Sequence, residues 1–185
     1  PPPPPPPPPP PFQNDPPTTE IYTLYLSSAA SDVYKRQHHY NINLQKTLED
    51  TLGEEGVQLI IRSAEESSFN NFRNLVDQFS YLRTVKSKLE MAATMYQNYG
   101  LGVIHLQEIN MGGGRITSPS SHHVTGWLAK HGRRKTPGCH FTRGWVAGVL
   151  AVIFDKPLGH YQMDEVRCKM VGDPDCVFLV SKKLD

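Results

Sequence analysis

The sequence lacks the features that identify several common protein classes. It has no apolar run near the roughly 18 residues that a membrane-spanning helix needs. No Gly-x-Gly-x-x-Gly follows an expected strand, and no Gly-Lys-Ser or Gly-Lys-Thr follows the glycine triplet 112–114, so neither a dinucleotide fold nor a phosphate loop is indicated. Only three cysteines are present, and this odd number favours a reducing compartment over a disulfide framework. We therefore expect a cytoplasmic protein without a membrane span.

The chain also has no strong excess of charge of either sign. From residue 38 onward it carries 17 Lys and Arg against 15 Asp and Glu. A nucleic-acid-binding domain usually shows a clustered basic face, whereas the single run at residues 131–135 is typical of a solvated helix end. We expect no direct contact with nucleic acid.

The first 37 residues differ from the rest of the chain. Residues 1–11 are all proline, a sequence that adopts polyproline II and buries nothing. Residues 27–37 read SSAASDVYKRQ, which resembles the translation of a transposase-based sequencing adapter, and residues 13–37 as a whole resemble translated adapter. We interpret residues 1–37 as artefactual and disordered and residues 38–185 as one domain. The native start would then be missing, and with it an upstream output domain.

Two helical patterns come first in the domain. Residues 44–64 have apolar side chains at helical spacing, and Gly53 and Gly56 weaken the middle, so one broken helix or two short ones are predicted. Residues 72–96 carry a longer apolar stripe that predicts a single helix stopped at Gly100. We favour a stripe that faces the core over one that pairs with a second chain, although a homodimer stays open.

After Gly100 the apolar period changes from that of a helix to that of a strand. Residues 102–109 alternate, and the glycine triplet predicts a turn into a second strand. A helix is expected from His122 to Lys130, capped by Ser120 or Ser121, and an apolar helix from 141 to 154. Residues 166–180 read as a hairpin that turns at 172–175. This order predicts an α+β fold in which helices cover an antiparallel sheet.

All three cysteines fall near the C-terminus, together with a glutamate at suggestive spacing. Glu165 lies three residues before Cys168, which lies eight before Cys176, and Cys139 comes from a separate element. Four such donors can form a tetrahedral zinc site. Ordinary buried cysteines or a disulfide between Cys168 and Cys176 are alternatives. Glu165 and Cys168 have opposite parity on a regular strand, so joint ligation requires a bulge between them.

The same stretch resembles the 4-vinyl reductase domain family. The matching features are Cys139 shortly before Gly144-Trp145 and Gly148, then Glu165-x-x-Cys168, Gly172-Asp173-Pro174 and Cys176-x-Phe178. The resemblance implies a 4-vinyl reductase-like ligand-binding fold. It also implies a structural zinc held by Cys139, Glu165, Cys168 and Cys176.

The resemblance implies a function as well. Relatives include aromatic-sensing domains of bacterial transcription activators, so a regulatory domain that binds a small hydrophobic or aromatic molecule is expected. Candidate pocket residues are Trp127, Phe141, Trp145, His105 and Tyr161. His122 and His123, at a helix start, are expected on the surface.

Two alternative functions follow from the same resemblance. One is an accessory role in reducing a vinyl group on a tetrapyrrole, and the other is an acyl-binding structural subunit of a tethering complex. No catalytic residue is assigned, because the adjacent Cys139 and His140 lack an identifiable orienting acid. We expect a binding protein rather than an enzyme.

Overall fold

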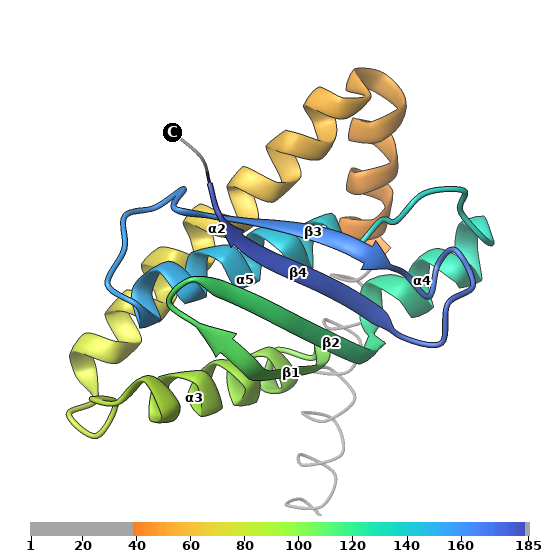
Figure 1. The fold of residues 1–185 in the computed structure, drawn as a ribbon. Coiled ribbons are helices and arrows are strands. Elements are labelled where there is room, and N and C mark those ends of the chain that lie inside the picture. The colour runs from red at the N-terminus through yellow and green to blue at the C-terminus, as the bar shows by residue number, and fades with distance from the viewer. Residues whose placement is uncertain (1–38, 184–185) are drawn as a thin grey trace, which may run out of the picture. The chain divides into compact units, whose positions relative to one another are not determined.

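The computed structural model describes residues 39–183, so the interpretation of residues 1–37 lies outside the described residues. Residues 39–52 are helical, and the chain then turns at Gly53, whose φ is 56°. The predicted break near Gly53 is therefore confirmed. The elements that follow are α2 (Glu54–Gln78), α3 (Val85–Asn98), β1 (Gly102–Asn110), β2 (Gly113–Ser121), α4 (His122–His131), α5 (His140–Ile153), β3 (Tyr161–Arg167) and β4 (Cys176–Lys182) (Figure 1).

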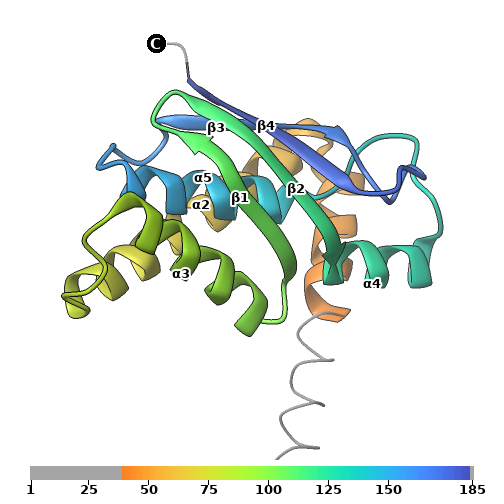
Figure 2. The ribbon, with the colours of Figure 1, turned by 60° about the horizontal axis from the view of Figure 1, so that its bottom comes forward.

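The four strands form one antiparallel sheet in the order β1-β2-β4-β3. The two hairpins join through β2 and β4, where Ile116 pairs with Phe178 and Ser118 with Cys176. α2 and α5 lie on the same face of the sheet, and α3 runs beside β1 (Figures 1 and 2). This arrangement confirms the predicted α+β fold with an antiparallel sheet covered by helices.

α5 is the central helix of the core and packs tightly against α2. Its residues from Gly144 to Ile153 are all buried. A Cβ added to Gly144 would collide with the carbonyl oxygen of Ile61, and one added to Gly148 would collide with that of Glu65. The two glycines thus permit a close approach of α2 and α5. Among residues 39–183, no helix is both long and apolar enough to cross a membrane.

The prediction of one helix over residues 72–96 is wrong. α2 ends at Gln78, Phe79 is extended, and α3 begins after Thr84. The Thr84 hydroxyl accepts a hydrogen bond from the Ser87 backbone N–H, and the Ser87 hydroxyl accepts one from the Thr84 N–H, which is a capping box. The apolar stripe continues across the break, which hid this local signal. Phe72 and Tyr96 are fully buried, so the stripe faces the core as predicted.

Both predicted hairpins are present, with shifted ends. Asn110 pairs with Gly113, so Met111 and Gly112 form the first turn, and the Asn110 side-chain oxygen accepts from the Gly112 N–H at 2.7 Å. The last hairpin begins earlier than residue 166 because β3 already starts at Tyr161. The predicted helix after Ser121 is confirmed as α4, which ends at Gly132.

Candidate metal centre and ligand groove

A bulge in β3 brings Glu165 and Cys168 to the same side of the sheet. Glu165 pairs with Phe178 and Arg167 with Val177, so one strand contains an extra residue, Val166, at this point. Val166 is 52% exposed and points away from the core. The extra residue reverses the alternation, and Cys168 therefore joins Glu165 on the inner face. The bulge that joint ligation requires is confirmed.

The three thiols and the carboxylate converge at the start of α5. Cys139, the residue before α5, has its Sγ 3.7 Å from that of Cys176 and 4.0 Å from that of Cys168. One ligand atom from each of these residues and from Glu165 lies within 4.8 Å of the other three. All three cysteines are buried and free, so the structure contains no disulfide between Cys168 and Cys176.

The cluster has the spacing and the donor types that zinc prefers. Zinc binds thiolates at about 2.3 Å in a tetrahedral arrangement, which places the sulfur atoms about 3.8 Å apart. The sulfur distances of 3.7 and 4.0 Å agree with that spacing. Glu165 Oε1 is buried and has no hydrogen-bond partner among the described residues. Since buried polar atoms are normally satisfied, this oxygen fits the role of a metal ligand.

The protonation of the cluster also fits a cation. Burial, together with the neighbouring Cys168 sulfur, raises the pKa of Glu165 to about 8. Hydrogen bonds with Cys168 and Cys176 raise the pKa of Cys139 well above its usual value, and bonds from Cys139 and Cys176 lower that of Cys168. The protein alone therefore favours one thiolate shared by two thiols. A bound divalent cation supplies the charge that lets the other groups ionise.

Backbone groups orient the donors. The Cys139 N–H donates to Glu165 Oε2 at 2.8 Å, and the Lys169 N–H donates to the Cys176 sulfur at 3.4 Å. The Cys168 N–H donates to Asp173 Oδ2 at 2.8 Å, which closes the turn between β3 and β4. These bonds hold the donors in place, as the outer partners of metal ligands usually do.

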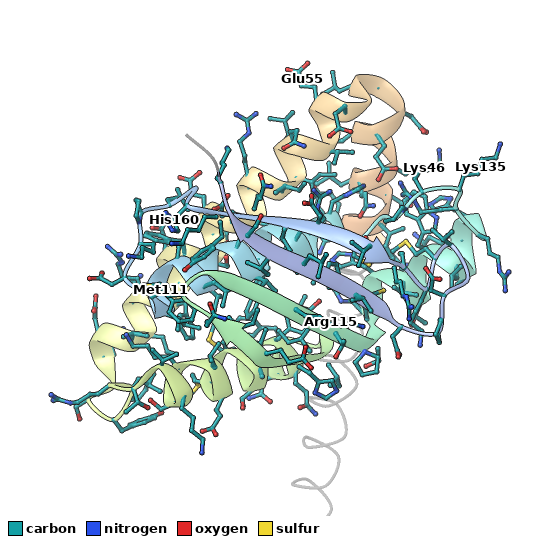
Figure 3. The ribbon with its side chains drawn as sticks, in the orientation of Figure 1. Lys46, Glu55, Met111, Arg115, Lys135 and His160 are labelled. Atoms are coloured by element: carbon teal, nitrogen blue, oxygen red, sulfur yellow. The ribbon has the colours of Figure 1, made fainter. Side chains whose placement is uncertain are left out.

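The five predicted pocket residues occupy different environments. Trp127, Trp145 and Tyr161 are buried, Phe141 is half-buried and His105 is exposed. The Tyr161 hydroxyl donates to the Met111 carbonyl at 2.9 Å. The Trp127 ring lies 4.3 Å from the guanidinium of Arg134, the residue before Lys135. Figure 3 shows Met111 and Lys135 at opposite ends of the molecule, so Tyr161 and Trp127 lie far apart.

A groove of about 640 Å³ opens between α3 and β1. This volume lies within the usual range of sites for small molecules. Of the five predicted residues, His105 lines this groove, while Tyr161 lines a different cavity beside α2. The groove is lined by Val85, Lys86, Leu89, Glu90, Ala93, Ile104, His105 and Leu106.

A buried polar pair lies between α3 and α5, and neither of its residues lines the groove. Tyr96 is one turn beyond Ala93 on the same face of α3, and it is fully buried. Its hydroxyl lies 2.8 Å from Thr142 Oγ1 on α5, and its ring makes an edge contact with Trp145 at 5.0 Å. Burial raises the pKa of Tyr96, so its hydroxyl stays protonated. No local signal in the sequence indicates this pair, because Tyr96 lies within an apolar stripe.

The prediction that His122 and His123 lie on the surface is wrong. His123 is only 2% exposed, and its ring lies 5.1 Å from that of Phe141. His122 is half-buried, with Nδ1 3.0 Å from the Leu101 carbonyl. The cause is tertiary, because α4 follows β2 without a loop and its first turn is therefore held against the sheet and α5.

The fold and the cluster together define the class of domain. The chain has an antiparallel sheet with helices on one face, and three cysteines and a glutamate meet where the sheet approaches the start of the central helix. This is the architecture that the 4-vinyl reductase resemblance implied. No protein-family model matches the chain, and no curated protein sequence matches it significantly.

Solved structures share the fold. The phenol-responsive sensory domain of the transcription activator PoxR, with phenol, is 20% identical, with a TM-score of 0.67 over 78% of this chain and 74% of that chain. A trafficking protein particle complex subunit 3 from Naegleria fowleri, covalently bound to palmitic acid, is 15% identical, with a TM-score of 0.50 over 81% and 97%. A vinyl-4-reductase family protein from Methanocaldococcus jannaschii is 17% identical, with a TM-score of 0.46 over 79% and 92%. The likeness to the PoxR sensory domain confirms the predicted fold.

Proposed function

We propose that residues 38–185 form a regulatory domain that senses a small hydrophobic or aromatic molecule and is held together by a structural zinc ion. The observation that carries the proposal is the groove between α3 and β1, which has the volume and the mostly apolar lining of a small-molecule site. The PoxR sensory domain, which shares the fold, responds to phenol. A phenol-like ligand is therefore the first class to test.

The groove and the polar pair beyond it suit a ligand with an apolar ring and one hydroxyl. Leu89, Ala93 and Ile104 would contact the ring, and the Tyr96 and Thr142 hydroxyls would exchange hydrogen bonds with the ligand hydroxyl. Trp145 lies against Tyr96 and would form part of the same pocket. Trp127, Phe141, His105 and Tyr161 remain candidate pocket residues, of which His105 already lines the groove.

The zinc would be held by Cys139, Glu165, Cys168 and Cys176. With four protein donors the site is closed, so the ion supplies a cross-link and no chemistry on the ligand. It would fasten the start of α5 to the turn between β3 and β4.

A ligand regulates such a domain only if it binds one conformation better than another. α3 forms one wall of the groove, so ligand binding would favour the position of α3 that closes on it. We propose that this shift passes to an upstream output domain or to a second copy of the chain in the cytoplasm.

A covalently held acyl chain is not part of the proposal. The palmitate-bound neighbour carries its lipid through a covalent bond. In this chain all three cysteines belong to the proposed zinc centre, and none lines the groove. Tetrapyrrole reduction likewise lacks an assigned catalytic residue.

The test is a calorimetric titration of the full chain with phenol, for the wild type and two variants. Ala93→Trp fills the groove from α3, and Asn98→Trp places the same side chain on an exposed part of that helix that faces away from the groove. We expect phenol binding in the wild type and in Asn98→Trp but not in Ala93→Trp. Absent binding in the wild type, or equal binding in all three proteins, would overturn the proposed site. Elemental analysis of the wild type should find about one zinc per chain.

A further inference from the structure

The helix at residues 39–52 is attached to the segment that leads into the metal centre. Ile42 is 1% exposed and fits beside Gly126 of α4, where a Cβ would collide with the Ile42 side chain. Lys46 lies at the same end of the molecule as Lys135, which belongs to the segment between α4 and α5 (Figure 3). One face of this helix is therefore part of the domain.

Glu49 is the centre of a largely buried polar network on that face. Its Oε2 and Oε1 lie 2.9 and 3.0 Å from Arg134 Nη1, and Oε1 lies 3.1 Å from His140 Nε2. The Gln45 amide donates to the same Oε1 at 2.8 Å. The exposed fractions of the Glu49, Arg134 and His140 side chains are 15%, 11% and 7%.

The charges in this network depend on one another. Burial disfavours the ionised Glu49, but hydrogen bonds from His140, Gln45 and Arg134 outweigh it and lower the pKa of Glu49 to about 2. The Arg134 guanidinium also lies over the Trp127 ring. Separating one partner from such a buried pair leaves the other charge uncompensated, which is strongly unfavourable.

The network is bonded to two of the three chain segments that carry the cysteines. The Gln45 amide donates to the carbonyl of Gly138, the residue immediately before Cys139, at 2.8 Å. The Arg134 backbone N–H donates to the carbonyl of Met170, two residues after Cys168, at 2.9 Å. His140 is the residue immediately after Cys139. Residues 39–52 thereby contact the residues on either side of Cys139 and, through Arg134, the segment after Cys168.

We propose that Gln45 and Glu49 are positioning residues of the metal centre, through which docking of the helix at residues 39–52 and occupancy of the centre stabilise each other. The inference rests on the zinc site of the proposed function and adds residues to it that lie about 90 positions away in the chain. Binding linkage is reciprocal, so whatever the docked helix adds to metal affinity, the metal adds to helix docking.

The test compares Glu49→Gln with Asp50→Asn in the full zinc-loaded chain. Glu49→Gln keeps the size of the side chain but loses its charge, and Asp50→Asn makes the same change at a neighbour that pairs only with Lys46 on the surface. Zinc release into an excess of chromogenic chelator is followed with time. Outer partners of metal ligands typically contribute 10- to 100-fold to affinity. We expect release about 10-fold faster in Glu49→Gln and unchanged in Asp50→Asn.

Hydrogen exchange of the zinc-loaded proteins separates this role from a general loss of stability. In Glu49→Gln, exchange should accelerate in residues 39–52 while the amides of α5 and β4 keep their protection. Gln45→Ala removes the bond to Gly138 and leaves the pair between Glu49 and Arg134, so it should accelerate zinc release in the same direction by less. It replaces Glu49→Gln as the test variant if that protein does not fold.

The outcomes distinguish this inference from the proposed function. Equal zinc release in the wild type, Glu49→Gln and Gln45→Ala would overturn the positioning role and leave the zinc site intact. A wild type without zinc would overturn the proposed centre and this inference with it. Faster release confined to the Glu49 and Gln45 variants supports both.

Discussion

The metal centre and the ligand groove differ in how their parts are held. The centre draws its four donors from three separate stretches of chain, and hydrogen bonds at 2.8 Å fix the backbone of Cys139 and Cys168. The groove is formed by two elements that follow each other in the chain, α3 and β1, and its lining is mostly apolar. The donors of the centre are held by hydrogen bonds between distant segments, whereas the groove depends on packing and on local helix structure.

This difference suits a sensor. A region that must change on ligand binding belongs to the less stable part of a fold, while its support must stay fixed. α5 connects the two regions. Cys139 of the centre directly precedes this helix, and Thr142 in its first turn contacts Tyr96 of α3, the helix that forms one wall of the groove. The predictions below separate the two regions experimentally.

Loss of the metal should have the largest effect. Structural zinc contributes about 10–16 kcal/mol in zinc-finger peptides, so strong chelation, Cys139→Ser and Cys176→Ser should each remove most of the folding stability. Thermal unfolding followed by circular dichroism, with zinc content measured on the same samples, checks this. Ser67→Ala on the exposed side of α2 is the control. Unchanged melting temperatures in both cysteine variants would mean that the cysteines only fill the core.

The second-largest effect is expected from acid, which should remove the contribution of the ionised Glu49 to folding stability. Its pKa is about 2 in the folded protein against an ordinary value of 4.5. A carboxyl group whose pKa is lowered on folding stabilises the folded state at pH values above its unfolded-state pKa. This stabilisation is lost as the pH falls, here between about 4.5 and 2. At about 1.4 kcal/mol per pKa unit, the contribution at pH 7 is about 3 kcal/mol.

The comparison with Glu49→Gln isolates this contribution. The difference in unfolding free energy between the wild type and Glu49→Gln should be full at pH 7 and should shrink as the pH falls below 4.5. Denaturant titrations at several pH values measure it, with Asp50→Asn as the control. A difference that does not vary with pH would show that the Glu49 charge is not the source.

Removing the Tyr96 hydroxyl should affect the groove and not the centre. In Tyr96→Phe, Thr142 loses its buried partner, which costs about 1–3 kcal/mol of stability. Phenol affinity should fall about 10-fold, because one neutral hydrogen bond is lost. Tyr99→Phe, which changes an exposed tyrosine on the same helix end, is the control. Zinc release should be unchanged in both, and phenol binding equal to wild type in Tyr96→Phe would place the ligand hydroxyl elsewhere.

The smallest effect is expected at the cap of α3. Thr84→Ala removes the capping box and should cost about 1 kcal/mol. Hydrogen exchange should accelerate in the first turn of α3, which borders the groove, while zinc release stays at the wild-type rate. Ser80→Ala, outside the cap, provides the comparison. A change in zinc release would show that the two regions are coupled through α3 as well as α5.

Local features of the sequence predicted the fold class and the bulge at the candidate metal centre. The change of apolar period at Gly100 separated helices from strands, and Gly53 and Gly132 ended helices where the sequence indicated. The opposite parity of Glu165 and Cys168 predicted the bulge, because side chains on a strand alternate whatever the sheet does elsewhere. The resemblance then supplied the pairing of Cys139 with these residues.

Apolar spacing gave a wrong prediction where two successive helices, α2 and α3, continue one apolar stripe. Residues 72–96 keep a helical stripe across the break at 79–84, because α2 and α3 both face the core. The capping box at Thr84 and Ser87 was a usable signal for this break.

Only the tertiary structure decided which distant polar groups meet. Thr142 lies 46 residues from Tyr96, and Arg134 lies 85 residues from Glu49, yet each pair is in hydrogen-bond contact. Periodicity shows which face of an element is buried, but it does not show which element covers that face. The sequence by itself therefore determined the fold class and the spacing of the candidate metal donors along the chain. The packing of α5 against the sheet and its neighbouring helices decided which of these distant groups come into contact.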